Sequence, residues 1–219
     1  MDDLARAART VFMAKGYKRT QVADVAAAVG LSPAAVYRHV ESKEALFHLC
    51  FLDTAIDGDG AVGSTDYVAT PAAAETMALI ADRLRAVGGV PRLRRALRSP
   101  GADVRVELRE IIAEQFEFVS RNHELLALIE ASASDLQDLR ELYFTKGRSR
   151  NTDDLTRYLR RRIEDGSLRS VPDVGIASLL IRESIAWFAW HGKGDPGVVL
   201  DDATSLPTLI DVLVEGLVA

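Results

Sequence analysis

Residues 16–47 read GYKRTQVADVAAAVGLSPAAVYRHVESKEALF and contain two short helical patterns, residues 20–29 and 32–39. A tight turn at Gly30-Leu31 separates the two patterns. This spacing is typical of a helix-turn-helix, whose second helix enters the major groove of DNA. A helical hairpin inside an ordinary all-α core has the same spacing, so the pattern alone leaves both interpretations open.

The signals around this pair place the ends of the neighbouring helices. Residues 2–15 carry apolar side chains at helical spacing, and Gly16 is expected to end that helix. Thr20 and Ser32 are residue types that cap helix N-termini, so we expect each to begin one helix of the pair. Ser42 is expected to begin a further, very apolar helix over residues 42–56.

The second helix of the pair presents side chains suited to DNA. Ala34 and Ala35 are expected to face outward, where their methyl groups can pack on thymine methyls. Arg38 has the reach for either a guanine edge or a phosphate. The side chains whose chemistry suits phosphate oxygens are Tyr37, His39 and Lys43.

The remainder of the chain also has helical periodicity, and we find no β-type alternation, so the predicted fold class is all-α. Residues 57–70 are rich in Gly and Asp and are expected to form a mobile loop. Asn122 is expected to interrupt a long amphipathic helix, leaving a short segment after it. The expected helices are residues 71–87, 91–98, 103–121, 136–165, 173–190 and a C-terminal helix.

Composition and charge exclude several classes of protein. Of the 219 residues, 48% are apolar and 27% charged, which indicates a globular chain. The only cysteine, Cys50, excludes an internal disulfide, and the four histidines lack metal-binding spacing, so no metal or other cofactor is expected. The first 50 residues carry a net charge of +2 and the remainder −7, which predicts a polyanionic partner for the N-terminal part only.

No segment suggests a membrane protein or a secreted one. No apolar run reaches the roughly 18 residues that a membrane span needs. The N-terminus, MDDLARAART, is charged from its second residue and does not resemble a signal peptide. We therefore expect a cytoplasmic protein without a membrane partner.

Residues 16–47 resemble the DNA-binding head of TetR-family transcriptional regulators. The resemblance implies a homodimeric repressor, less often an activator, that binds a palindromic DNA operator and is released by a small-molecule effector. It further implies a three-helix DNA-binding domain, residues 1–48, and a larger helical effector-binding and dimerisation domain, residues 49–219. The matching positions are Gly16-Tyr17, Thr20, Val25-Ala26, Gly30-Leu31-Ser32, Tyr37, His39, Val40, Ser42, Lys43 and Leu46.

The resemblance also assigns roles by position. It implies that Thr20 and Gln21 begin the second helix near the DNA backbone and that His39 and Lys43 bind phosphate. It places Tyr37 with the two alanines at the groove. The expected DNA-binding residues are Thr20, Gln21, Ser32, Ala34, Ala35, Tyr37, Arg38, His39 and Lys43.

Two polar residues lie within apolar helical arcs of the larger domain and are candidates for binding the effector. Gln115 falls in the middle of an apolar arc of residues 103–121, and Glu183 falls between apolar residues of 173–190. The alternatives are a structural amide with protein partners for Gln115, and for Glu183 an arginine partner across a dimer interface or a water-filled gap. The candidate effector-binding residues are Met77, Gln115, Phe116, Tyr143, Glu183 and Trp187.

The helix at residues 173–190 is apolar on nearly every side, which predicts that it packs both on its own domain and on a second copy. Residues 136–165 or the C-terminal helix are the candidates to complete a four-helix dimer bundle. We expect residues 42–56, as the only segment joining head and body, to transmit effector binding to the DNA-binding head.

Two other functions compete with regulation. An all-α enzyme would use Glu183 with His123 or His191 as acid and base, although the chain has no nucleophile or phosphate-binding motif. A helical adaptor would use the head to bind protein. We expect a regulator and no enzymatic activity.

Overall fold

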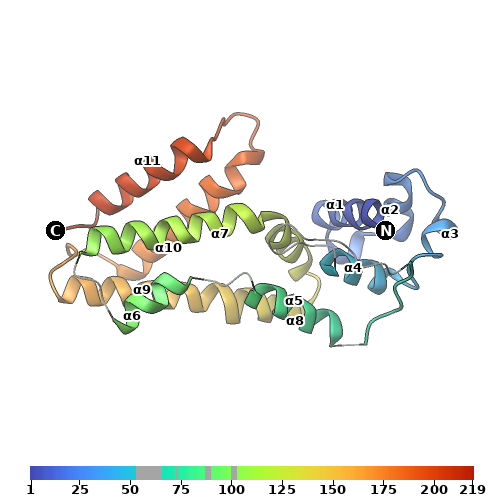
Figure 1. The fold of residues 1–219 in the computed structure, drawn as a ribbon, viewed down its shortest axis with the longest axis horizontal. Helices are drawn as coiled ribbons and strands as arrows, with labels where there is room; N and C mark the ends of the chain where they lie inside the picture. The colour runs from blue at the N-terminus through green and yellow to red at the C-terminus, as the bar shows by residue number, and fades with distance from the viewer. Residues whose placement is uncertain (53–65, 73, 87–89, 100–102) are drawn as a thin grey trace. The chain divides into compact units, whose positions relative to one another are not determined.

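The computed structural model describes residues 1–52, 66–72, 74–86, 90–99 and 103–219, and these are almost entirely helical (Figure 1). Within the described residues, β-type pairing is limited to two isolated bridges, Val40 with Val68 and Leu168 with Val218. The predicted all-α fold is therefore confirmed. The chain divides into two compact units, which are described separately.

The N-terminal unit comprises Met1–Val87 and Glu124–Phe144. Figure 1 shows its first four helices, in blue, grouped together. The unit also includes the last part of α7 and the beginning of the π-helix that follows α8. Its own helices are α1 (Asp2–Arg19), α2 (Val22–Ala28), α3 (Pro33–Val36), α4 (Lys43–Leu52), α5 (Glu75–Ala86) and α8 (Gln137–Arg140).

An aromatic cluster joins α1 to α4 in the core of the N-terminal unit. The ring centroid of Phe47 lies 5.0 Å from those of Phe12, Tyr17 and Phe51, each at a steep interplanar angle. Edge-to-face pairs of this kind add to the free energy gained from burying the rings. The cluster fixes α4 against α1 and so positions the segment between α3 and α4.

Gly16 interrupts α1 as predicted, although helical residues continue after it to Arg19. Its φ of 76° lies in the left-handed region, and a Cβ atom there would stand 2.9 Å from the carbonyl oxygen of Ala131. Both constraints favour glycine. The turn is held by the N–H of Lys18, which donates to the Asp135 carboxylate at 2.7 Å.

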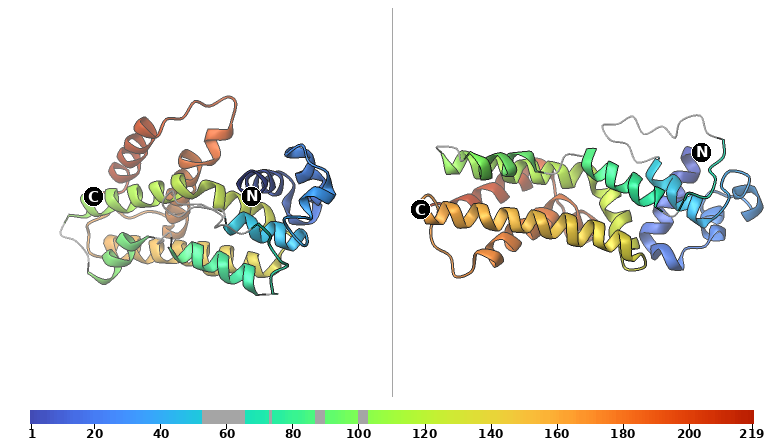
Figure 2. Two further views of the ribbon diagram at one scale, coloured as in Figure 1. Left: turned by 45° about the vertical axis from the view of Figure 1, so that its right-hand side comes forward. Right: turned by 90° about the horizontal axis from the view of Figure 1, so that it is seen from below.

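The C-terminal unit comprises Gly88–His123 and Thr145–Ala219. Here the first part of α7 packs with α9, α10 and α11 around an apolar core, and α9 runs alongside α7 in Figures 1 and 2. Its helices are α6 (Pro91–Arg98), most of α7 (Val104–Ala133), α9 (Ser149–Glu164), α10 (Val174–Ala189), the 3₁₀-helix η2 (His191–Gly194) and α11 (Asp202–Glu215).

The middle of the chain differs from the expectation in two places. Asn122 does not interrupt its helix, because its side-chain amide donates to the Phe118 carbonyl one turn earlier and α7 continues to Ala133. The helix expected at 136–165 is helical throughout, from Gln137 to Glu164, but its middle forms a π-helix, η1 (Glu141–Arg148), which includes Gly147.

Two expectations about the chain after α4 have only partial answers. The predicted mobile loop at 57–70 lies mostly outside the described residues, but residues 66–70 of it are described, and Val68 packs in the core of the N-terminal unit. The predicted domain boundary at residue 48 stays a prediction, because compact packing does not identify which residues bind DNA.

Among the described residues, no helix is both long enough and apolar enough to cross a membrane. The same part of the chain has no group of three or more His, Cys, Asp or Glu side chains arranged to hold a metal ion.

Candidate nucleic-acid interface

Helices α2 and α3 form the predicted helix-turn-helix. The turn passes through Gly30, whose φ is 68°, and the N–H of Leu31 donates to the Ala26 carbonyl at 2.9 Å. Ser32 caps α3 as expected, because its hydroxyl oxygen accepts a hydrogen bond from the N–H of Ala35 at 3.2 Å. Glycine at the left-handed position allows the sharp turn that places α3 across α2.

The outer face of this motif is accessible. Ala34, Arg38 and Gln21 are exposed, and 48% of the Tyr37 surface is accessible to solvent. No hydrogen bond or ion pair holds the Arg38 side chain within the part of the chain that the structure describes. These four side chains are therefore positioned to contact a groove or a phosphate backbone.

The expectation that Ala35 faces outward was wrong, because its residue surface is only 9% exposed. Helix α3 is a single turn of four residues, and its inner side carries both Ala35 and the fully buried Val36. A groove contact through the Ala35 methyl group would need that side to be exposed. Ala34 is left as the outward alanine.

The expectation that Thr20 caps α2 was also wrong. Thr20 is buried, and its hydroxyl donates to the Gly16 carbonyl at 2.7 Å, which closes the end of α1. The cap position belongs to Gln21, whose N–H donates to the Asp24 carboxylate at 2.9 Å. Hydrogen bonds from Lys15 and from Gln21 lower the pKa of Asp24, so the carboxylate stays charged at the helix N-terminus.

His39 and Lys43, the two predicted phosphate ligands, lie on either side of the turn between α3 and α4. A ring nitrogen of His39, Nδ1, is 3.3 Å from the Asp66 carbonyl oxygen. The Lys43 ammonium donates to the Lys18 carbonyl at 3.1 Å and lies 4.6 Å from the centre of the Tyr17 ring. Both side chains are partly exposed, so these contacts orient them without burying them.

The Tyr17 ring is itself fixed beneath Lys43. Its hydroxyl donates to the Glu44 carboxylate at 3.0 Å. Burial, together with that hydrogen bond and the negative charge of Glu44, raises the pKa of Tyr17 well above its usual range. The phenol is therefore neutral at physiological pH and provides a stable ring face for the ammonium.

Of the candidate effector-binding residues, Gln115 and Phe116 lie inside the C-terminal unit. They are 4% and 2% exposed. The side-chain nitrogen of Gln115, Nε2, is buried and has no hydrogen-bond partner among the described residues. An unpaired buried amide lowers the stability of a folded protein by about 1–3 kcal/mol. This cost makes Gln115 a candidate for binding a ligand.

Glu183 lies elsewhere than expected. The buried face of α10 is formed by Ser178, Ile181, Ile185 and Ala189, so the arc containing Glu183 is the exposed one. The Glu183 carboxylate accepts hydrogen bonds from Arg148 at 3.0 Å and from Arg182. Partial burial raises the pKa of Glu183, but the two arginines outweigh this effect and lower it overall. Glu183 therefore has two arginine partners within the chain, and its role in binding the effector stays a prediction.

The remaining candidates occupy different places. Trp187 is 44% exposed, on the same side of α10 as Glu183. Met77 and Tyr143 belong to the N-terminal unit, where both pack at the edge of its core and the Tyr143 hydroxyl donates to Glu130 at 3.1 Å. Gln115 with Phe116, and Glu183 with Trp187, are the pairs of candidates that lie near each other along a helix.

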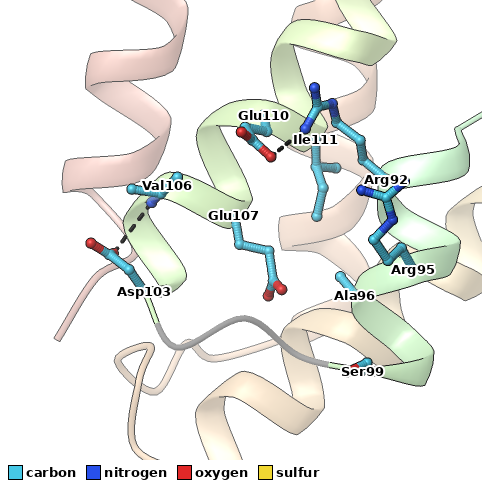
Figure 3. Close-up of a pocket in the computed structure, with 9 residues that line it drawn as sticks. All are labelled: Arg92, Arg95, Ala96, Ser99, Asp103, Val106, Glu107, Glu110 and Ile111. Atoms are coloured by element: carbon cyan, nitrogen blue, oxygen red, sulfur yellow. Dashed lines mark hydrogen bonds and ion pairs between the residues drawn. The ribbon is translucent and has the colours of Figure 1, made fainter.

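A pocket that the sequence did not predict lies between α6 and the beginning of α7 (Figure 3). It has a volume of about 310 Å³, and its walls combine apolar surface with charged side chains. Arg92 pairs with Glu110 across it. None of the candidate effector-binding residues lines it. The lining residues are Arg92, Arg95, Ala96, Ser99, Asp103, Val106, Glu107, Glu110 and Ile111.

The pocket adjoins a buried ion pair. The side chains of Glu107 and Arg162 are 13% and 6% exposed, and they are hydrogen-bonded to each other. Packing of α9 against α7 covers both side chains. In such a buried pair each charge compensates the other.

Comparison with known proteins adds to this geometry. Residues 4–50 match the model of the bacterial regulatory proteins of the tetR family. The match covers α2, α3 and most of α1 and α4. No curated protein matches the sequence.

Solved structures share the fold along nearly the whole chain. The ketosteroid transcriptional regulator KstR2 of Mycobacterium tuberculosis is 19% identical, with a TM-score of 0.60 over 99% of this chain and 94% of that one. PfmR, a TetR-family regulator from Thermus thermophilus, is 23% identical, with a TM-score of 0.54 over 97% of each chain. FadR of Bacillus subtilis, in complex with stearoyl-CoA, is 18% identical, with a TM-score of 0.50 over 98% and 97%.

The fold and the exposed helix-turn-helix define a DNA-binding transcriptional regulator. Residues 4–50 match the DNA-binding head of the tetR family of bacterial regulatory proteins, and the chain as a whole shares its fold with solved TetR-family regulators.

Proposed function

We propose that this regulator is a homodimeric repressor that binds a palindromic DNA operator and is released from it by a small apolar effector. Such a protein would act in the cytoplasm, where the DNA of a bacterium lies. The observation that carries the proposal is the open face of the helix-turn-helix, where Ala34, Tyr37 and Arg38 are exposed next to His39 and Lys43.

Point substitutions test the DNA contacts. Lys43→Ala and His39→Ala are expected to weaken binding to all duplexes and to make its salt dependence shallower, because phosphate contacts do not depend on sequence. Tyr37→Ala is expected to weaken binding more on a duplex selected by the wild-type protein than on a mixed sequence. If Lys43→Ala changed the sequence preference and left the salt dependence unchanged, the assignment of Lys43 would be wrong.

The exposed side of α10 supports the homodimer. Ile176, Leu180 and Trp187 are 63%, 60% and 44% exposed, and their spacing places them on one side of the helix. On α11, Val212 is 65% exposed. An apolar stripe of this kind is commonly covered by a partner, and two helices from each of two copies make a four-helix bundle. A twofold dimer would present its two α3 helices about 34–36 Å apart, one turn of DNA.

The interior of the C-terminal unit supports an apolar effector with a hydrogen-bond acceptor. Gln115 offers an unpaired amide N–H donor among apolar side chains, and ligand pockets commonly combine apolar walls with a few polar groups. Among the proteins with a similar fold, FadR was solved in complex with stearoyl-CoA, and KstR2 is described as a ketosteroid transcriptional regulator. They suggest acyl-CoA thioesters, whose acyl chain is apolar, and steroids as the first compounds to test, since both classes carry carbonyl oxygens.

Effector binding and DNA binding must be linked. A compound can release the operator only if it binds better to a state whose two heads no longer match the half-sites. The operator must then weaken effector binding by the same factor. Calorimetry with a compound that causes release, in the presence and absence of operator DNA, is the test. Equal affinities in the two titrations would rule out release by this mechanism.

No observation favours the enzyme or adaptor hypotheses over regulation. The carboxylate on which the enzyme hypothesis depends, Glu183, is engaged by two arginines. We expect the same compounds to be recovered unchanged after incubation with the protein.

A further inference from the structure

Residues 66–70 lie against the turn that joins α3 to α4. The N–H of Val68 donates to the His39 carbonyl at 2.8 Å, and the N–H of Glu41 donates to the Val68 carbonyl at 3.0 Å. These two hydrogen bonds flank Val40 and make the isolated bridge between Val40 and Val68. Both valines are buried in the core of the N-terminal unit. The contact therefore combines backbone pairing with apolar packing.

Three further contacts extend this pairing. The N–H of Thr70 donates to the Glu41 carboxylate at 2.7 Å, and its hydroxyl donates to the Ser42 hydroxyl oxygen at 2.8 Å. At the other end, the Asp66 carbonyl is 3.3 Å from His39 Nδ1. Residues 66–70 thus contact His39, Glu41 and Ser42, which stand immediately before Lys43. We call residues 66–70 the strap.

The turn that the strap contacts follows a very short helix. Helix α3 has only four residues, and a helix this short gains little stability from its internal hydrogen bonds. Ser42 also accepts a hydrogen bond from the N–H of Ala45 at 3.1 Å, so the strap reaches the residue that caps α4. A segment paired to both sides of the turn restricts the positions of His39 and Lys43.

We propose that the strap is a positioning element of the DNA-binding site. It holds the turn between α3 and α4 in the conformation that presents His39 and Lys43 to the phosphates, so that less conformational freedom is lost on binding DNA. Thr70 and Val68 are its principal positioning residues. The inference rests on the proposed DNA-binding function.

The strap also corrects the expectation that residues 42–56 are the only segment joining head and body. After Thr70 the chain continues through Pro71 towards α5, so α5 has a direct connection to the DNA-contacting turn. Helix α5 packs against α4, where the His48 ring is 2.9 Å from the Thr76 hydroxyl. Residues 53–56 of the predicted segment lie outside the described residues.

Substitutions in the strap test the proposal. Thr70→Val removes the hydroxyl donor and keeps the shape of the side chain, whereas Thr70→Ser keeps the hydroxyl. Val68→Pro keeps an apolar side chain but removes the N–H that donates to His39. Ala69→Ser is the matched control, because Ala69 is exposed and has no side-chain contact of this kind.

The measurement is fluorescence anisotropy with two duplexes of equal length, one selected from a random pool by the wild-type protein and one of mixed sequence. Thr70→Val is expected to weaken binding to both about fivefold and Val68→Pro about tenfold, with Thr70→Ser and Ala69→Ser close to wild type. Because phosphate contacts are lost, Val68→Pro is also expected to reduce the slope of log affinity against log salt by about one.

A double-mutant cycle separates positioning from general stability. If the strap acts through the phosphate-contacting residues, Thr70→Val in a Lys43→Ala background is expected to weaken DNA binding less than twofold. Additive effects with an unchanged salt slope would overturn the proposal, as would wild-type affinity for Val68→Pro or Thr70→Val. If Val68→Pro does not fold, the proposal is tested by comparing the DNA affinities of Thr70→Val and Thr70→Ser. Wild-type protein that binds neither duplex would refute the proposed function itself.

Discussion

Helices α7 and α10 each carry one polar side chain in the middle of an apolar arc, but the two side chains have opposite surroundings. Gln115 on α7 is buried with an unpaired amide nitrogen, whereas Glu183 on α10 is half exposed and bound to two arginines. The periodicity of a helix shows that an arc is apolar but does not show what covers it. On α7 the rest of the unit covers the arc, and on α10 we propose that a second copy does.

The largest expected effect is on the stability of the dimer that, in our proposal, covers the apolar arc of α10. Leu180→Glu places a charge in the middle of the exposed stripe and is expected to weaken the dimer at least 100-fold, because a carboxylate without a partner is costly to bury. Light scattering at micromolar concentration is expected to show a monomer for the variant and a dimer for the wild type.

The matched control for Leu180→Glu is Val199→Glu. Val199 is also an exposed apolar residue, at 99% exposure, but it lies outside α10 and α11. The control is expected to remain a dimer. The proposal that a second copy covers the stripe would be wrong if the wild-type protein is a monomer. It would also be wrong if the Leu180→Glu variant remains a dimer.

The second prediction concerns the interior of the C-terminal unit. Gln115→Leu replaces an unpaired amide with an apolar side chain of similar size and is expected to raise the free energy of unfolding by about 1–2 kcal/mol. The same variant is expected to keep its DNA affinity and to lose release by the effector. Denaturant unfolding and anisotropy measure the two effects. Destabilisation by Gln115→Leu would mean that the amide has a structural partner such as ordered water.

Local signals explain which parts of the fold the sequence predicted. Gly30 and Ser32 determine a turn and a cap within a few residues, and both were predicted with their roles. The beginning of α10 was also predicted at the right place, where Asp173 caps the helix by accepting from the N–H of Ile176 at 2.9 Å. These features depend on residues adjacent in the chain, so they can be read without knowing the tertiary structure.

Predictions that depended on distant contacts were less successful. Ala35 faces the core because of how α3 packs, and the strap pairs residues about 28 positions apart in the sequence. The buried pair of Glu107 and Arg162 joins two helices, which no helical period can show. The open face of the helix-turn-helix was predictable from residues 30–43, whereas its support by the strap was not.

The third prediction tests a buried polar group that does have a partner. His48 lies between α4 and α5 beside Thr76, and burial lowers its pKa despite the opposing charge of Glu75. The unfolded chain therefore binds a proton at a higher pH than the folded chain. Stability is expected to decrease as the pH falls below about 6.5, with a slope of at most about 1.4 kcal/mol per pH unit. His48→Gln is expected to remove this part of the pH dependence in chemical unfolding between pH 5 and 7.

The smallest effect is expected at Glu183. Glu183→Gln weakens contacts with Arg148 and Arg182 that are partly exposed, so the free energy of unfolding of the chain is expected to change by less than about 1 kcal/mol. The lowered pKa of Glu183 means that its contribution is present above about pH 4.5 and is lost as the pH falls through the folded value, so the variant and the wild type should converge in acid.

Light scattering of Glu183→Gln then decides what the carboxylate does in the dimer. If Glu183→Gln stays dimeric and responds to the effector, the carboxylate only orients the two arginines beside the stripe. If the variant dissociates, the ion pairs are covered in the dimer, where removing one partner leaves an unpaired charge and costs far more than at an exposed site. If the variant stays dimeric but is no longer released from DNA by the effector, Glu183 belongs to the effector site. The contrast drawn between α7 and α10 would then be wrong.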